Sequence, residues 1–139
     1  MKSTERQKVY NKYNGKCAYT GKPLDDKWQV DHVTPKQLAS YFYSHISRDA
    51  MNCKGDSVHS FENLLPTLRI VNHYKRGFDL EMFRQYMLTF HIRLAKLPIN
   101  PKVEKSKNRK KYMLTVAAAF DITPDKPFSG KFYFEKTEI

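Results

Sequence analysis

The stretch Trp28-Gln29-Val30-Asp31-His32-Val33-Thr34-Pro35 begins as an apolar–polar alternation, reaches adjacent Asp and His residues, and is then broken by a proline. The alternation predicts a β-strand over Trp28–His32. In a strand, the side chains of Asp31 and His32 point to opposite faces, so both reach one site only if the strand ends, twists or bulges there. Pro35 favours an early end, because proline cannot continue a ladder and restricts the residue before it.

Two later segments carry further polar side chains. In Phe61-Glu62-Asn63-Leu64-Leu65-Pro66, an asparagine stands just before an apolar pair. In Val71-Asn72-His73-Tyr74-Lys75-Arg76-Gly77, the glycine ends a helix that we predict from about residue 67 to residue 76. The Asn, the Lys and the Arg of that helix share a face, because residues three and four positions apart are neighbours. We interpret the chain as a scaffold that brings these segments and the Asp-His pair around one divalent cation.

The order Asp-His, then Asn-Leu, then Asn-x-x-Lys resembles the HNH endonuclease superfamily. The match covers roughly Tyr13 to Gly77, and it includes the run Tyr13–Gly21, which looks like the first hairpin of many members. The resemblance implies an α+β fold with a ββα-metal (HNH/His-Me finger) core. We expect additional elements around that core, mostly α, with a short C-terminal strand.

Hydrolysis of a phosphodiester requires a deprotonated water, stabilisation of the charge at phosphorus, and help for the leaving 3′ oxygen. A side chain that titrates near neutrality, such as an imidazole, suits the first task. A hard cation serves the other two, and Mg²⁺ prefers oxygen ligands while keeping several waters. By the resemblance, His32 is the general base, and Asp31 and Asn72 are the ligands of Mg²⁺ or Mn²⁺.

The resemblance also implies roles for residues around the reacting groups. Asn63 corresponds to the middle letter of the motif, and we expect it to pin the neighbouring loop by backbone hydrogen bonds. Lys75 matches the trailing lysine of Asn-x-x-Lys and is expected to contact phosphate, with Arg76 as a further candidate for the same task.

The last metal ligand has two candidates, Asn72 and His73, because the final letter of the motif can be Asn or His. The two residues are about 100° apart on a helix, so we do not expect both to coordinate one ion. The spacing to Lys75 favours Asn72. A site that used His73 instead would tolerate softer metals such as Ni²⁺ or Zn²⁺.

The chain has 139 residues and a formal net charge of +11. This length favours one domain over 1–139, with the finger core at about 13–77 and helical support with a basic segment at about 78–139. The excess positive charge favours a polyanionic partner, here DNA, through phosphate contacts and counterion release. The candidate phosphate contacts in the densest basic segment are Lys105, Lys107, Arg109, Lys110 and Lys111. The plain alternative for this segment is a solvated helix start or loop.

A nucleic-acid-binding module on the same fold, without turnover, would carry the same charge. The presence of every expected catalytic letter favours the nuclease. Whether the protein forms a homodimer or works with a partner protein stays open. No apolar run is long enough to span a bilayer, and no secretory signal is evident, so we expect a cytoplasmic location and no membrane partner.

Two cysteines, Cys17 and Cys53, cannot form a structural zinc site alone, since that takes four Cys or His ligands. Many members of the resembled family carry two CxxC pairs. Here Thr20, Leu68 and Val71 stand where the other cysteines would be, so we expect apolar packing in place of a zinc knot. A disulfide between the two cysteines is disfavoured in a reducing cytoplasm.

The turn at Thr20–Pro23 predicts a hairpin in which Cys17–Tyr19 pairs with Trp28–His32. The other expected elements are a first helix ending near Asn14, a helix with an aromatic side over Gln37–Tyr43, an irregular loop over 47–59, a helix from about Leu80 to Leu97 capped by Asp79, a helix continuing from Tyr112 to near Thr123, and a strand over Lys131–Glu135. We assign no role to His45 or His59.

Overall fold

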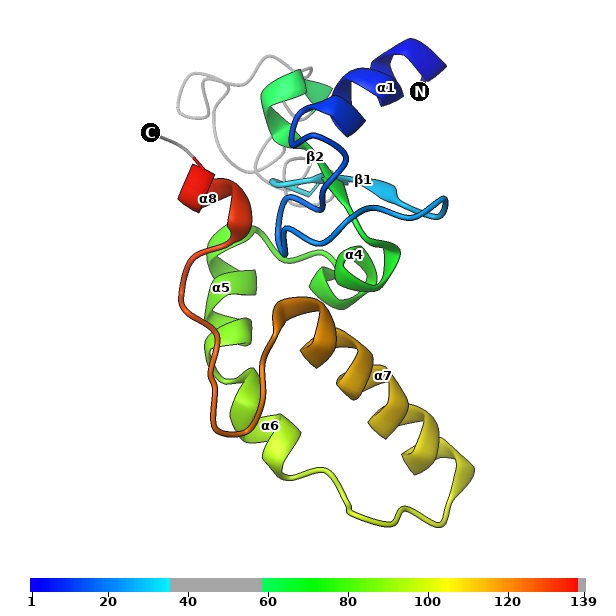
Figure 1. Ribbon diagram of the computed structural model, residues 1–139, viewed down its shortest axis with the longest axis vertical. Coiled ribbons are helices and arrows are strands. Elements are labelled where there is room, and N and C mark those ends of the chain that lie inside the picture. The colour runs from blue at the N-terminus through cyan, green and yellow to red at the C-terminus, as the bar shows by residue number, and fades with distance from the viewer. Residues whose placement is uncertain (36–58, 138–139) are drawn as a thin grey trace, which may run out of the picture.

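Figure 1 shows a computed structural model of the chain, which describes residues 1–35 and 59–137. The described elements, in chain order, are α1 (Ser3–Asn11), β1 (Gln29–His32), the 3₁₀ helix η2 (Phe61–Asn63), β2 (Leu64–Thr67), α4 (Arg69–Lys75), α5 (Leu80–Leu88), α6 (Phe90–Ala95), α7 (Glu104–Phe120) and α8 (Tyr133–Thr137). Outside the described residues lie Cys53, His45 and the segment 37–43, over which a helix is expected. The fold therefore mixes helices with a small sheet, as the sequence predicts at that coarse level.

Strands β1 and β2 form a two-stranded antiparallel sheet. Gln29 pairs with Thr67 at one end of the ladder, and His32 pairs with Leu64 at the other. Helix α4 follows β2 directly and packs beside the sheet (Figure 1). The three segments singled out in the sequence are thus neighbours in space, in the chain order strand, strand, helix.

The predicted hairpin partner of β1 is wrong. Cys17–Tyr19 is not a strand, and the segment that contains it has one isolated bridge, between Lys16 and Pro23. The partner is β2 instead, the segment just before the helix that was predicted from about residue 67. Pro66 lies inside β2 and lacks an N–H, but its carbonyl accepts a bond of 2.8 Å from the Ala18 amide. A two-stranded sheet has only edge strands, which is where proline is tolerated.

Helix α1 ties the two strands together from one side. Lys12 Nζ donates to the carbonyl oxygens of Phe61 and Leu64, each at 2.7 Å. Arg6 donates to the carbonyl of Trp28 at 2.7 Å and lies over its indole ring. The start of β2 and the entry to β1 are therefore both fixed to the same short helix.

The expected long helix over Leu80–Leu97 is two helices, α5 and α6, separated at Thr89. In an unbroken helix the Tyr86 carbonyl would accept from the backbone four residues later. Here it accepts instead from the Arg93 guanidinium at 2.7 Å and from the Thr89 hydroxyl at 3.2 Å. The predicted cap is confirmed, since the Asp79 carboxylate accepts from the Met82 amide at 2.8 Å.

The expected strand over Lys131–Glu135 is also wrong, because the chain turns into helix α8 from Tyr133. The first two amides of this helix donate to the segment before β1, from Tyr133 to the Tyr19 carbonyl at 3.1 Å and from Phe134 to the Ala18 carbonyl at 2.8 Å. The segment that was expected to form the first strand therefore pairs briefly with the C-terminal segment.

The core is aromatic where the C-terminal segment meets α5 and the Tyr19 loop. Phe132 is fully buried; its ring stacks on Phe83 and meets Tyr19 edge to face, with centroids 5.3 and 5.2 Å away. Gly21, at φ +76°, is needed beside this cluster, because a Cβ there would stand 2.6 Å from the Tyr133 ring. Val71 is part of the core and Leu68 packs against it, which is the apolar packing expected at these two positions.

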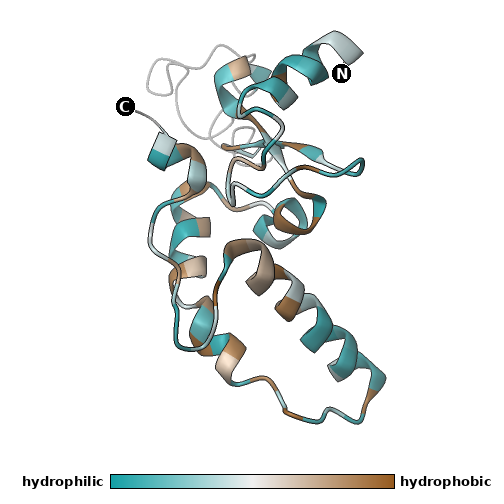
Figure 2. Cartoon of the chain, viewed as in Figure 1, coloured by the Kyte–Doolittle hydropathy of each residue, from teal (hydrophilic) through white to brown (hydrophobic). Residues whose placement is uncertain are grey.

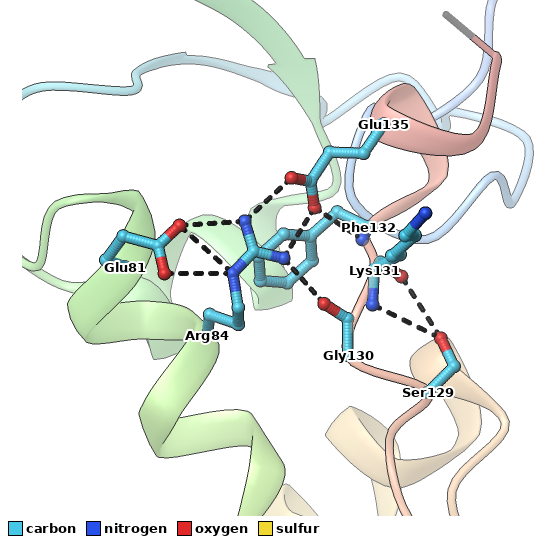
Figure 3. A network of polar contacts seen from close by, with 7 residues as sticks. All are labelled: Glu81, Arg84, Ser129, Gly130, Lys131, Phe132 and Glu135. Carbon is cyan, nitrogen blue, oxygen red and sulfur yellow. Dashed lines mark hydrogen bonds and ion pairs between the residues drawn. The ribbon is translucent and has the colours of Figure 1, made fainter.

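Arg84 of α5 holds the C-terminal segment in place (Figure 3). Its guanidinium makes two bonds of 2.7 Å to the Glu135 carboxylate and one of 2.6 Å to the Gly130 carbonyl. A second carboxylate, Glu81, contacts the same guanidinium at 3.0 to 3.1 Å but is 69% exposed, against 24% for Glu135. These bonds hold the pKa of Arg84 above its usual range and lower the pKa of Glu135 from its ordinary 4.5.

Figure 2 shows hydrophilic residues over the N-terminal half of α7 and hydrophobic ones towards its C-terminal end, which packs near α4. In the part of the chain that the structure describes, no helix combines the length and the apolar character needed to cross a bilayer.

We expect Glu135→Gln to lower the free energy of unfolding by about 1 to 2 kcal/mol at neutral pH, because a partly buried charge-assisted pair is lost. Glu81→Gln touches the same guanidinium from an exposed position, so its effect should stay within about 0.5 kcal/mol. Urea denaturation of both variants tests this ranking.

The pH dependence has a definite sign. A carboxylate whose folded pKa is depressed adds stability above its unfolded pKa, and that stability is lost as pH falls through the folded value. The difference between wild type and Glu135→Gln should therefore be full above pH 4.5 and shrink as the pH falls below it. A difference that stayed constant down to low pH would contradict the assignment.

Candidate functional site

Asp31 projects from β1 into the interior and is only 5% exposed. Its Oδ2 accepts a short hydrogen bond from the Tyr19 hydroxyl. Lys75 Nζ of α4 lies 3.3 Å from Oδ2 and 3.4 Å from Oδ1 of the same carboxylate. The carboxylate is thus held from two sides, by the loop before β1 and by the helix after β2.

Lys75, which the resemblance assigns to a phosphate contact, is fully buried. Besides Asp31, its ammonium group donates to the carbonyl oxygens of His32 at 3.2 Å and of Val33 at 3.4 Å. Lys75 therefore binds both the carboxylate and the backbone where β1 ends. This contact lies where β1 ends, but Asp31 and His32 are both paired residues of the strand, so their side chains still alternate between its two faces.

The electrostatics of this pair follow from its burial. Burial raises the pKa of the Asp31 carboxyl, although the nearby Lys75 charge and the Tyr19 hydrogen bond act in the opposite direction. Burial lowers the pKa of the Lys75 ammonium, and Asp31 opposes that shift. Burial and the adjacent Asp31 raise the pKa of Tyr19 well above its usual value. Each charge in the pair is therefore favourable only while its partner is present.

Asn63 fixes the chain that follows His32. Its side-chain oxygen accepts from the Thr34 amide at 2.8 Å, and its amide group donates to the Thr34 carbonyl at 3.1 Å. Its own carbonyl accepts from the Val33 amide at 2.9 Å. These are backbone bonds of the kind expected for the middle asparagine, and they hold the two residues after His32 against the start of β2.

His32 lies at the end of β1 and is half-buried, on the opposite side of the strand from Asp31. Its ring meets the exposed His59 edge to face, with centroids 5.6 Å apart. Its backbone is fixed by Lys75 on one side and by the Asn63 segment on the other. The imidazole is therefore held on a rigid backbone while part of its surface stays accessible.

Asn72 and His73 point to different parts of the molecule. Asn72 Nδ2 donates to the Gln29 side chain at 2.8 Å, and Gln29 stands two residues before Asp31 on the same face of β1. His73 Nδ1 lies 2.8 Å from the Tyr112 hydroxyl of α7. Of the two candidate ligands, Asn72 is thus the one whose side chain faces β1.

The donor set of Asp31 and Asn72 fits a hard cation in type, since a carboxylate and an amide oxygen are ligands that Mg²⁺ accepts alongside water. The amide of Asn72 bonds to Gln29 through its nitrogen. The carboxylate of Asp31 is already shared by Tyr19 and Lys75, so a cation there would share Asp31 with the Lys75 ammonium.

Arg76 is exposed and ends α4 in a strained conformation, with φ 55° and ψ −137°. A non-glycine residue in that region costs about 1 to 3 kcal/mol, and such strain concentrates at functional positions. Gly77, which would bear the strain more easily, is the next residue. An arginine side chain therefore stands where the backbone alone favours glycine.

The basic residues of α7 divide between two faces of the helix. Among the residues that the structure describes, Lys107, Lys110 and Lys111 line a shallow hollow along α7, whereas Lys105 and Arg109 are exposed outside that lining. The five candidates therefore do not form one surface.

Sequence reasoning missed Tyr19 and Gln29, which hold the two candidate metal ligands. Tyr19 lies twelve positions before Asp31, and Gln29 lies 43 positions before Asn72. Neither pair has a spacing typical of one helix or strand, so no local pattern predicts these contacts.

The chain matches no protein-family model, and neither a curated protein nor a solved structure is significantly similar to it.

Lys75→Met should lower the free energy of unfolding by about 3 to 5 kcal/mol, because it leaves the Asp31 carboxylate buried without its partner. Asp31→Asn should be costly for the converse reason. The double variant removes both charges, so it should be less destabilised than the sum of the two single variants by more than about 1 kcal/mol. Urea denaturation of the four proteins measures the coupling, and strictly additive losses would show that the pair is not a unit.

Proposed function

We propose that this protein is a metal-dependent DNA endonuclease of the HNH type. The observation that carries the proposal is the meeting of three segments along β1, from Gln29 at its start to His32 at its end. Asn63 fixes the backbone after His32, Lys75 binds the carbonyl of His32, and Asn72 faces the strand through Gln29. This arrangement gathers the motif residues on a strand–strand–helix unit, which is the order that a ββα-metal finger has.

In the proposed mechanism His32 accepts the proton of the attacking water. An imidazole suits this role because it exchanges protons near neutral pH. The half-buried ring lies on a backbone that Lys75 and Asn63 both restrain. Asn63 acts as a positioning residue, since its bonds go to the Thr34 backbone and keep the chain after His32 in one conformation.

Asp31 and Asn72 would hold a single Mg²⁺ or Mn²⁺. When bound, the ion supplies electrostatic stabilisation of the phosphate oxygens and of the leaving oxygen. Tyr19 and Gln29 orient the two ligands, and Lys75 offsets the charge of Asp31 in the buried site.

DNA is the proposed substrate because the net charge of +11 favours a polyanion. Arg76 lies exposed at the end of α4, one turn from Asn72, and its strained backbone supports a role for its side chain. We therefore propose Arg76 as a phosphate contact near the site.

A second candidate is a nucleic-acid-binding module with the same fold and no turnover. The ion pair between Asp31 and Lys75 favours it, because the carboxylate already has a cationic partner within 3.3 Å. The proposal of catalysis therefore has to be tested separately from DNA binding.

The first test is conversion of supercoiled plasmid by the purified protein with Mg²⁺, with Mn²⁺ and with EDTA. We expect nicking or cutting with either metal and none with EDTA. His32→Ala should lower the rate by at least about a hundredfold, because a general base contributes on the order of 10²–10⁴-fold. DNA binding by gel shift should survive the substitution.

His59→Ala is the matched control, since it removes the imidazole that faces His32. It should cut at a rate close to that of wild type. Cutting by His32→Ala at the wild-type rate would exclude the mechanism. Metal-independent binding without cutting by any form would favour the binding module.

Arg76→Gly should leave the free energy of unfolding unchanged or raise it by up to about 1 kcal/mol, because glycine relieves the positive φ. It should also weaken DNA binding and lower the salt dependence, log K against log salt, by about 0.9, since one phosphate contact is lost. Arg76→Lys, which keeps the charge and the strain, is the control. A glycine variant that binds DNA like wild type would remove Arg76 from the interface.

A further inference from the structure

We propose that a groove along the exposed face of α7, continuing onto the outer face of α4, binds the sugar–phosphate backbone of duplex DNA. The inference rests on the proposed function, because it takes DNA as the partner. It adds residues to the interface that no sequence motif marks, and it separates the basic residues of α7 into those that bind and those that do not.

Two adjoining hollows make up the groove. The first has a volume of about 520 Å³ and is lined by residues that include Lys107, Lys111 and Leu114. The second has a volume of about 750 Å³ and extends to the α4 residues Arg69 and His73. Both hollows are lined by Thr115 and Ala118, so they adjoin one another on α7.

The helical repeat explains the shape of this groove. Lys107, Lys111, Thr115 and Ala118 follow one another at spacings of three or four residues, so they occupy one face of α7. The small side chains Thr115 and Ala118 line both hollows, and Lys107 and Lys111 line only the first of the two. From Lys107 to Ala118 the helix rises roughly 16 Å, which corresponds to about five base pairs along a DNA strand.

The charge of the lining matches a polyanion. Lys107, Lys110 and Lys111 stand at one end, and Lys22, Lys27 and Arg69 stand at the other. The lining residues include one acid, Asp25, whose carboxylate accepts from the Lys27 amide at 3.0 Å.

Two of these cations already have a partner within the protein. Lys22 pairs with Asp121 at 2.9 Å, and Lys110 donates to the Ile99 carbonyl at 2.8 Å. The exposed cations Lys27, Arg69, Lys107 and Lys111 are therefore the ones that the groove offers to phosphate.

The groove leads to the candidate site. Arg69 in its lining lies one helical turn before Asn72 on α4. His73 and Tyr112 join α4 to α7 across the groove by their 2.8 Å contact. Burial raises the pKa of the Tyr112 hydroxyl, and the charge of Arg76 on α4 opposes that shift. A DNA strand held along α7 would therefore pass over α4 towards Asn72 and the start of β1, where Gln29 pairs with Thr67.

Helix α7 itself provides a matched comparison. Lys107 and Lys111 lie four residues apart in the groove, whereas Lys105 and Arg109 lie four residues apart outside its lining. The double variants Lys107→Gln/Lys111→Gln and Lys105→Gln/Arg109→Gln lose the same charge from the same helix, so overall charge alone affects them equally. Fluorescence anisotropy with a labelled DNA duplex, over a range of salt and without divalent ions, measures both in the full chain carrying His32→Ala.

We expect the groove variant to lower the slope of log K against log salt by about 1.8 and to raise Kd roughly 10- to 100-fold at 0.1 M salt, because two phosphate contacts are lost. The matched variant should change Kd less than about threefold. Lys27→Gln/Arg69→Gln, at the other end of the groove, should resemble the groove variant. Thermal unfolding of each variant shows whether the fold is retained.

Equal losses in the two α7 variants would overturn the proposal in favour of diffuse charge, and so would no loss in either. A wild-type chain that does not bind duplex DNA at low salt would overturn it as well. Plasmid cutting by the chain with His32 intact, measured in parallel, separates the two proposals. Cutting without groove dependence removes only the groove, whereas groove-dependent binding without cutting removes only the nuclease.

Discussion

The structure around the candidate site depends on one buried ion pair, between Asp31 of β1 and Lys75 of α4. Each group would be strongly unfavourable alone, because burial penalises the charged form of both. Together they join β1 to α4, the helix that follows β2. The same ammonium binds the His32 and Val33 carbonyls, so the pair also sets where β1 ends. The position of the His32 backbone is therefore a consequence of a contact made by its neighbour.

The support behind Asp31 comes from the far end of the chain. Tyr19 donates to the carboxylate, and its carbonyl in turn accepts from the Tyr133 amide. Phe132 packs against the Tyr19 ring, while Arg84 holds the C-terminal segment through Glu135. The residues after the motif, which look dispensable for chemistry, thus carry the framework that orients a candidate metal ligand. At the exposed end of α4, the Arg76 backbone adopts a conformation that costs stability.

Charge is arranged differently in the interior and on the surface. In the interior formed by residues 1–35 and 59–137, the Lys75 ammonium is matched to the Asp31 carboxylate and positions the groups around it. Outside, α7 places Lys107 and Lys111 on a face that is continuous with α4, and turns Lys105 and Arg109 away from it. A helix can do this because residues four apart align while residues two apart diverge. The net charge of +11 is therefore a property of the whole chain, whereas the proposed contact with DNA belongs to one face.

The sequence by itself determined the mixed fold, the strand at Gln29–His32, the cap at Asp79 and the order of the motif segments, because alternation, capping and spacing are local patterns. Only the tertiary structure decided the partner of β1, the break at Thr89 and the helical form of Tyr133–Thr137. The partner of β1 and the placement of the C-terminal helix depend on groups far apart in the chain, whereas the break at Thr89 depends on how the Arg93 side chain folds back onto the Tyr86 carbonyl. Asp31 and Lys75 are 44 positions apart, and burial of an ion pair at that separation follows from how the helix packs on the sheet.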